Sequence, residues 1–126
     1  MPPALDQKES GMTDNHGTAR GPLHDLTVVD FSRVLAGPFA TALLADLGAR
    51  VIKIEPPNGD DYRHIGPFIG DDSALFAFAN RGKESISLDL KKPDDLQFAL
   101  QLAEHADIVV ENFRPGVADK LGIGAD

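Results

Sequence analysis

The chain has 126 residues, no cysteine and a formal net charge of −8, with 42% apolar and 25% charged residues. This length is sufficient for one small domain with a hydrophobic core, and the composition is ordinary for a globular protein. The lack of cysteine excludes disulfides and thiolate metal sites. The acidic balance argues against unspecific nucleic-acid binding, because no basic excess is available to neutralise phosphates. The apolar runs are too short to span a membrane, and the first residues lack a secretory pattern, so we expect a cytoplasmic protein.

The first segment, residues 1–21, has little apolar content and no hydrophobic periodicity. Its prolines, glycines and charges predict a disordered N-terminal tail. His16 lies in this segment, and we interpret it as a solvated side chain. Folded structure is therefore expected in residues 22–126.

Residues 28–55 contain the patterns of a strand, a tight loop, a helix and a second strand. An apolar, β-branched run from Val28 is typical of a buried parallel strand. Pro38 near the start of the helical pattern and Gly48 after its end are both favourable there. A second apolar run ends before Pro56. The segment therefore predicts a right-handed βαβ unit, whose free helix N–H groups could bind an anion. Three large apolar residues recur on one face of the helix: Phe39, Leu43 and Leu47.

The segment over residues 56–72 is rich in glycine, proline and aspartate, which predicts a long loop. Asp60, Asp61 and His64 lack a recognised metal-ligand spacing, so we interpret them as part of a solvated acidic loop and expect no metal site.

The patterns that follow predict a helix over residues 73–80 capped by Ser73, an alternating strand over 84–90, a helix that begins at Pro93, an apolar strand over 106–111 and a helical turn over 117–121. This alternation predicts an α/β fold: a Rossmann-like, open, mostly parallel sheet with helices on both faces. Ligands of such sheets bind outside the carboxyl ends of the strands.

No G-x-G-x-x-G turn, Walker loop or nucleophile elbow is present in the sequence. The remaining signal is a set of cations at loop positions, many near strand ends, in an otherwise acidic chain. Solvated surface charges and a site for a phosphate-bearing ligand are both open interpretations. These cations are Arg33, Arg81, Lys83, Lys91, Lys92, Arg114 and Lys120. The residues alone thus indicate an anion- or nucleotide-binding α/β module.

Four blocks of sequence together carry a family resemblance: DFSRVLAGPFATALLADLGARVIKIEPPNGDD, NRGKESISLDLKKP, ADIVVENFRPG and KLGIG. They resemble the N-terminal part of a family III coenzyme A transferase, the group of formyl-CoA transferase and carnitine CoA-transferase. The resemblance runs from about Pro22 to the last residue. It implies that residues 22–126 are the N-terminal portion of a Rossmann-like large domain, truncated in this chain.

The resemblance implies transfer of CoA from an acyl-CoA to a carboxylic acid through a covalent aspartyl intermediate. The aspartate would lie beyond Asp126, so no catalytic residue is expected here. CoA or acyl-CoA would be a substrate, and no permanently bound cofactor is implied. The complete protein would be a homodimer of interlocked chains, and the isolated chain would expose apolar surface.

The resemblance also implies a set of CoA contacts. Lys91 would contact a phosphate and Phe113 the adenosine end. Leu35 replaces a glutamine that one family transferase uses in its active site, and Pro56 replaces an arginine that often lies near the adenine. Lys120 stands where the family has a basic residue, usually arginine. The implied set is Val34, Leu35, Ala36, Pro56, Leu88, Asp89, Leu90, Lys91, Asn112, Phe113, Arg114 and Lys120.

Two alternatives remain open. An α-methylacyl-CoA racemase shares the fold family but catalyses isomerisation with acid and base residues. The insert over residues 59–80 resembles the transferases more closely. A catalytic aspartate in the next unit would indicate a transferase, and a histidine–aspartate pair a racemase. The other alternative is a non-catalytic CoA-binding module.

Overall fold

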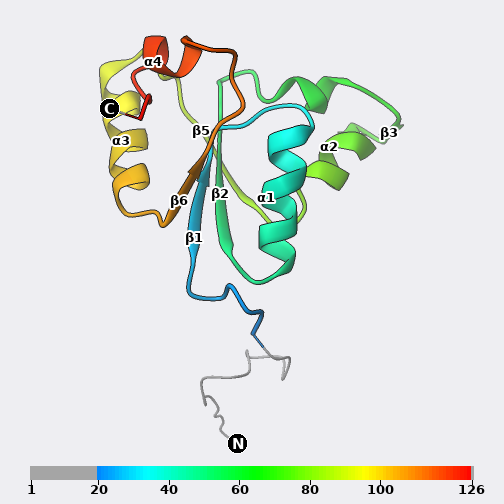
Figure 1. Cartoon of the computed structure of the whole chain (residues 1–126). Helices are drawn as coiled ribbons and strands as arrows, with labels where there is room; N and C mark the ends of the chain where they lie inside the picture. Colours follow the sequence, from blue (N-terminus) through cyan, green and yellow to red (C-terminus); the bar gives the residue numbers. More distant parts are fainter. Residues whose placement is uncertain (1–19, 126) are drawn as a thin grey trace, which may run out of the picture.

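The structure, a computed structural model, describes residues 20–125 (Figure 1). The predicted tail over residues 1–21, including His16, therefore lies almost entirely outside the described residues. The elements, in chain order, are β1 (Thr27–Asp30), α1 (Ala36–Asp46), β2 (Arg50–Glu55), the 3-10 helix η2 (Asp61–His64), β3 (Phe68–Ile69), β4 (Asp72–Ser73), α2 (Ala74–Ala79), β5 (Glu84–Ser87), α3 (Pro93–Glu104), β6 (Ile108–Val110) and α4 (Val117–Leu121).

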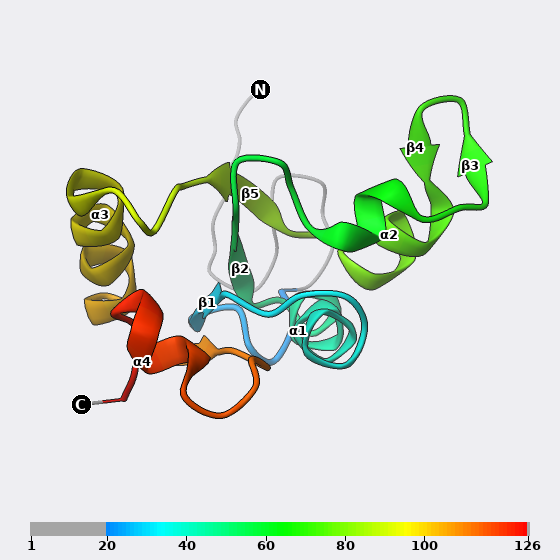
Figure 2. The ribbon, with the colours of Figure 1, turned by 90° about the horizontal axis from the view of Figure 1, so that it is seen from above.

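The main sheet has four parallel strands in the order β5-β2-β1-β6. Helices α1 and α2 lie on one side of the sheet and α3 on the other, as the view from above shows (Figure 2). The predicted open parallel sheet with helices on both faces is therefore confirmed. The chain moves outward from β1 to β2 and β5 and then returns to place β6 on the other side of β1. The order of the sheet thus reverses between β1 and β6.

Alternate residues of β1 divide the core between the two faces of the sheet, because successive side chains of a strand point to opposite sides. Val29 belongs to a cluster with Phe31, Ile54, Leu88 and Ala99, on the face that α3 covers. Val28 belongs to a second cluster with Ala49 and Val51, against which Leu44 and Ala45 of α1 pack. Both faces therefore bury apolar surface, as the continuous apolar run in this strand predicts.

Helix α1 packs through small side chains rather than through its large ones. Its buried residues are Gly37, Pro38, Thr41 and Ala42. Leu43 and Leu47 remain 43% and 46% exposed. The slim face lets the helix axis approach the sheet closely, so the face that carries Leu43 and Leu47 points away from the described core. Gly48, with a φ of 103°, ends the helix in the left-handed conformation that favours glycine.

The segment over residues 56–72 is more ordered than the loop that the composition predicts. It contains η2 and the strands β3 and β4, which pair as an antiparallel hairpin. Asp60 is fully buried, so its interpretation as a solvated residue is wrong. Ser73 caps α2, as predicted, because its hydroxyl accepts a hydrogen bond from the N–H of Phe76 at 3.2 Å. Within residues 20–125, no helix has the length and apolar character required to cross a bilayer.

Candidate functional site

A cavity of about 440 Å³ lies at the carboxyl ends of all four parallel strands. This is the edge where ligands of open α/β sheets bind, and the cavity spans the point where the strand order reverses. Its walls come from the segments that follow β1, β2, β5 and β6, and from α4. They are formed by Phe31, Arg33, Ile54, Glu55, Pro56, Pro57, Asn58, Leu88, Asp89, Leu90, Lys91, Phe113 and Leu121.

The structure brings together half of the CoA contacts that the resemblance implies. The residues that line the cavity are Pro56, Leu88, Asp89, Leu90, Lys91 and Phe113. The residues outside its lining are Val34, Leu35, Ala36, Asn112, Arg114 and Lys120. Implied contacts from three separate segments therefore converge on one cavity, while Arg114 and Lys120 are exposed and do not line it.

Sequence reasoning did not include Arg33 among the CoA contacts, although it identified Arg33 as a loop cation. Arg33 lines the cavity, and its guanidinium carbon lies 5.2 Å from the centre of the Phe113 ring. Two other loop cations serve different roles: Arg81 pairs with Asp46 at 2.7 Å and Lys83 with Asp30 at 3.0 Å. Charge at a loop position in the sequence does not reveal such partners, so it could not separate Arg33 from Arg81 and Lys83.

Asn112 joins the two segments that meet at the reversal point. Its Oδ1 accepts the N–H of Arg33 at 2.9 Å, and its Nδ2 donates to the carbonyl of Arg33 at 2.9 Å. Asn112 thus holds the backbone from which the Arg33 side chain extends. Its role in this structure is to position a cavity residue rather than to line the cavity.

The loop between β1 and α1 has an unusual backbone. Val34 has a φ of 69°, which is rare for a β-branched residue. Its N–H donates to both carboxylate oxygens of Asp60, at 3.1 and 3.2 Å. A side chain at Gly37 would collide with Ser32, whose Cβ lies 2.2 Å from the position of an added Cβ. Strained backbone that is fixed by surrounding contacts is frequent at functional sites.

Two buried lysine–aspartate pairs lie beneath this loop. Lys53 contacts Asp60 at 2.8 Å and Lys83 contacts Asp30 at 3.0 Å, and all four side chains are at most 2% exposed. Burial raises the pKa of Asp30, but hydrogen bonds from Ser32 and Thr41 and the Lys83 ammonium outweigh it and hold that pKa below its ordinary value. Burial lowers the pKa of Lys83, although Asp30 opposes this effect.

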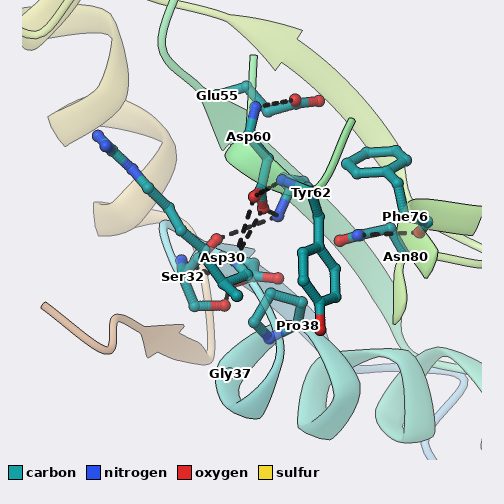
Figure 3. Close-up of polar contacts among 12 residues, drawn as sticks. Asp30, Ser32, Gly37, Pro38, Glu55, Asp60, Tyr62, Phe76 and Asn80 are labelled. Carbon is teal, nitrogen blue, oxygen red and sulfur yellow. Dashed lines mark hydrogen bonds and ion pairs between the residues drawn. The ribbon is translucent and has the colours of Figure 1, made fainter. Parts of the chain in front are cut away.

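Glu55 is the carboxylate at the cavity wall that the structure holds most firmly in its ionised form. Burial raises its pKa, but hydrogen bonds from the Arg63 guanidinium, the Ser85 hydroxyl and the N–H of Asp60 lower it to about 2. The two Arg63 contacts are both 2.7 Å long. Figure 3 shows Asp60 between Glu55 on one side and Ser32 and Asp30 on the other. A carboxylate with this pKa is unsuited to exchange protons near neutral pH.

The described residues offer no arrangement for metal binding, since residues 20–125 contain no group of three or more suitable side chains. Asp60 lies near Asp61 and His64 in the sequence, but its carboxylate forms an ion pair with Lys53. Every buried carboxylate described above has a cationic partner. The cavity lining offers two cations and both aromatic and aliphatic side chains to a ligand, beside the carboxylates of Glu55 and Asp89.

Such a cavity, at the reversal point of an open parallel sheet, is the position where doubly wound α/β proteins bind their ligands. The family model described as CoA-transferase family III matches residues 23–126. The chain belongs to CoA-transferase family III.

Known relatives agree with this assignment. The chain is 56% identical over 104 residues to acetyl-CoA:oxalate CoA-transferase of Acetobacter aceti, and the match covers 82% of this chain and 27% of that protein. It is 49% identical over 109 residues to succinyl-CoA:mesaconate CoA-transferase of Haloarcula hispanica, covering 82% and 28% respectively. Among solved structures, an aspartate-to-alanine mutant of Rv3272 from Mycobacterium tuberculosis is 44% identical with a TM-score of 0.78, covering 85% of this chain and 29% of that one. The chain thus spans less than a third of the length of these relatives.

Proposed function

We propose that this chain is the acyl-CoA-binding part of an enzyme that transfers CoA from an acyl-CoA donor to a carboxylic acid. CoA is a substrate in this proposal and not a resident cofactor. The observation that carries it is the cavity at the carboxyl ends of β1, β2, β5 and β6, in a member of this family.

The cavity offers separate surfaces for the parts of a CoA molecule. Lys91 and Arg33 supply cations for phosphate groups, with Arg33 able to form paired hydrogen bonds. The Phe113 ring and the side chains of Leu88 and Leu90 supply apolar contacts for the adenine. The negative charge of Glu55 is balanced by Arg63, so that carboxylate opposes a phosphate less than an isolated one would.

The reacting carboxylate in this proposal is an aspartate outside this chain, which attacks the thioester carbonyl and forms covalent intermediates. The pairing of the chain's own buried acids supports this view. Asp30, Glu55 and Asp60 are held by Lys83, Arg63 and Lys53 respectively. An acid fixed in an ion pair is a poor nucleophile, because attack would break the ion pair.

The complete protein, we infer, is a cytoplasmic homodimer with interlocked chains. The exposed apolar side chains of this chain support a larger assembly: Leu43, Leu47, Phe68, Ile69 and Phe78 are each more than 40% exposed. Light scattering on the full-length protein tests the dimer, and a monomer at micromolar concentration would contradict it.

Titration calorimetry of the 126-residue chain with CoA tests the binding part of the proposal. A transferase assay on the full-length gene product tests the reaction, with acetyl-CoA and succinyl-CoA as donors and oxalate and mesaconate, the acids in the names of the two relatives, as first acceptors. Saturable CoA binding together with transfer supports the proposal. Binding without transfer to any acid would indicate a non-catalytic module, and racemisation of a branched acyl-CoA would indicate the isomerase.

A further inference from the structure

The two ends of the β1–α1 loop are held by buried ammonium groups. Lys53 Nζ donates to the carbonyl of Ser32 at 3.0 Å, where the loop begins. Lys83 Nζ donates to the carbonyl of Pro38 at 2.9 Å, in the first turn of α1. Both lysines come from distant positions in the sequence, and neither is part of the cavity lining. A buried lysine therefore holds each end of the loop.

The middle of the loop is held by the partner of one of these lysines. Asp60 accepts the N–H of Val34 and also the Lys53 ammonium at 2.8 Å. The Asp60 carboxylate further accepts the N–H of Tyr62 at 3.0 Å, and its own N–H donates to Glu55 at 2.9 Å. These contacts fix the carboxylate, so the position of Val34 is set by a group that cannot readily move.

We propose that Lys53 and Asp60 are positioning residues that lock the β1–α1 loop in its strained conformation and thereby hold Arg33 at the cavity. A buried ion pair contributes little net stability, because desolvation of both charges offsets their attraction. Its value in this fold is geometric: it presents one fixed acceptor to Val34, directly after Arg33. The effect on a phosphate-bearing ligand rests on the proposed function, whereas the effect on the loop does not.

Two double variants of the 126-residue chain test the side-chain acceptor at position 60, which serves the N–H groups of Val34 and Tyr62. Lys53→Met/Asp60→Asn removes both buried charges and keeps a side-chain oxygen at position 60. Lys53→Met/Asp60→Leu removes the charges and the oxygen, and neither variant leaves a buried charge without a partner. Val51→Ala, in the core and away from the loop, controls for loss of global stability. Asp61→Asn controls for charge at an exposed neighbour.

Amide hydrogen exchange at Val34 and the dissociation constant for CoA are measured on each variant. In the leucine variant, the loss of global stability alone sets an expected rate of exchange at Val34, and the measured rate should exceed it at least about fivefold. CoA binding should be about fivefold weaker than in the parent chain, which corresponds to one lost hydrogen bond. The asparagine variant keeps the acceptor for Val34 but loses the hydrogen bond from Lys53 to the Ser32 carbonyl, so both effects should be present but clearly smaller than in the leucine variant. Both controls should show Val34 exchange that follows global stability alone.

The proposal is overturned if Val34 exchange in the leucine variant follows global stability as it does in Val51→Ala. It is also overturned if the asparagine variant loses as much protection and affinity as the leucine variant, since charge and not the hydrogen bond would then be decisive. If the parent chain binds no CoA, the proposed function fails, while exchange at Val34 still decides whether Asp60 holds the loop.

Discussion

The guanidinium carbon of Arg33 lies 5.2 Å from the centre of the Phe113 ring, across the point where the strand order of the sheet reverses. Arg33 follows β1 and Phe113 follows β6, and these strands are neighbours in the sheet. Asn112 fixes the backbone of Arg33 from the adjacent position. One cation and one aromatic ring are thus presented together at the cavity, by segments about 80 residues apart.

Lys91→Ala should weaken CoA binding by about tenfold, because a hydrogen bond to a charged group contributes about 1.5–3 kcal/mol. Calorimetry measures the effect, and dephospho-CoA identifies which phosphate is involved. Lys92→Ala is the matched control, since Lys92 is the neighbouring lysine, is exposed and does not line the cavity. Equal effects of the two substitutions would mean that only net charge matters.

Phe113→Leu should weaken binding of CoA by about fivefold while leaving binding of pantetheine, which lacks the adenine, nearly unchanged. Leucine retains apolar packing against the core cluster but removes the ring, whose stacking on the adenine would contribute about 1 kcal/mol. Phe98→Leu, at an exposed position of α3, is the control. A similar loss for both ligands would argue against a role for the ring in adenine recognition.

Asn112→Ala should destabilise the chain by about 1–2 kcal/mol and weaken CoA binding, because it removes both hydrogen bonds to Arg33. Asn112→Asp keeps the acceptor for the N–H of Arg33 and loses the donor to its carbonyl, so an intermediate effect is expected. Urea unfolding and calorimetry provide the two measurements. Unchanged CoA affinity in the alanine variant would show that the orientation of Arg33 is not important for binding.

The stability of the chain should fall in acid partly because of Glu55. Its pKa is lowered from 4.5 to about 2, so the folded state favours its ionised form. That contribution is fully present above about pH 4.5 and is lost as the pH falls through about 2. Its size is on the order of 2 kcal/mol, after allowance for the half-exposed Arg63.

Glu55→Gln should therefore lower the free energy of unfolding at neutral pH and flatten its decline between pH 5 and 2. Urea unfolding at a series of pH values measures both effects. Glu84→Gln is the control, because Glu84 pairs with Arg50 on the surface, where both side chains are at least 60% exposed. A pH dependence unchanged by Glu55→Gln would show that other carboxylates determine the acid transition.

Most of the fold could be predicted from the sequence, because the residues that begin and end its elements act through local contacts. The run from Val28, the glycine stop at Gly48 and the Ser73 cap each specify a boundary through contacts within a few residues. The packing face of α1 was not accessible in this way, since the pattern of large apolar residues points to Leu43 and Leu47. In the structure, the small residues of the helix pack against the sheet instead. Which face packs depends on how closely the helix and the sheet approach each other.

The candidate site was predictable to a lesser extent, because its key contacts join distant segments. Lys53 lies within an apolar strand pattern, and nothing near it in sequence indicates that it neutralises Asp60. The link between Asn112 and Arg33 likewise spans 79 positions. The strand ends indicated where a ligand would bind, but not which side chains line the cavity and which ones hold the loops in place.

The most direct measurement is the map of backbone amide shift changes when CoA is added to the isotopically labelled 126-residue chain. Saturable changes concentrated at Arg33, Leu90, Lys91 and Phe113 are predicted, because these residues surround the cavity. Changes confined to other surfaces, such as α1 around Leu43 and Leu47, or no changes at millimolar CoA, would contradict the assignment of this cavity as the CoA site.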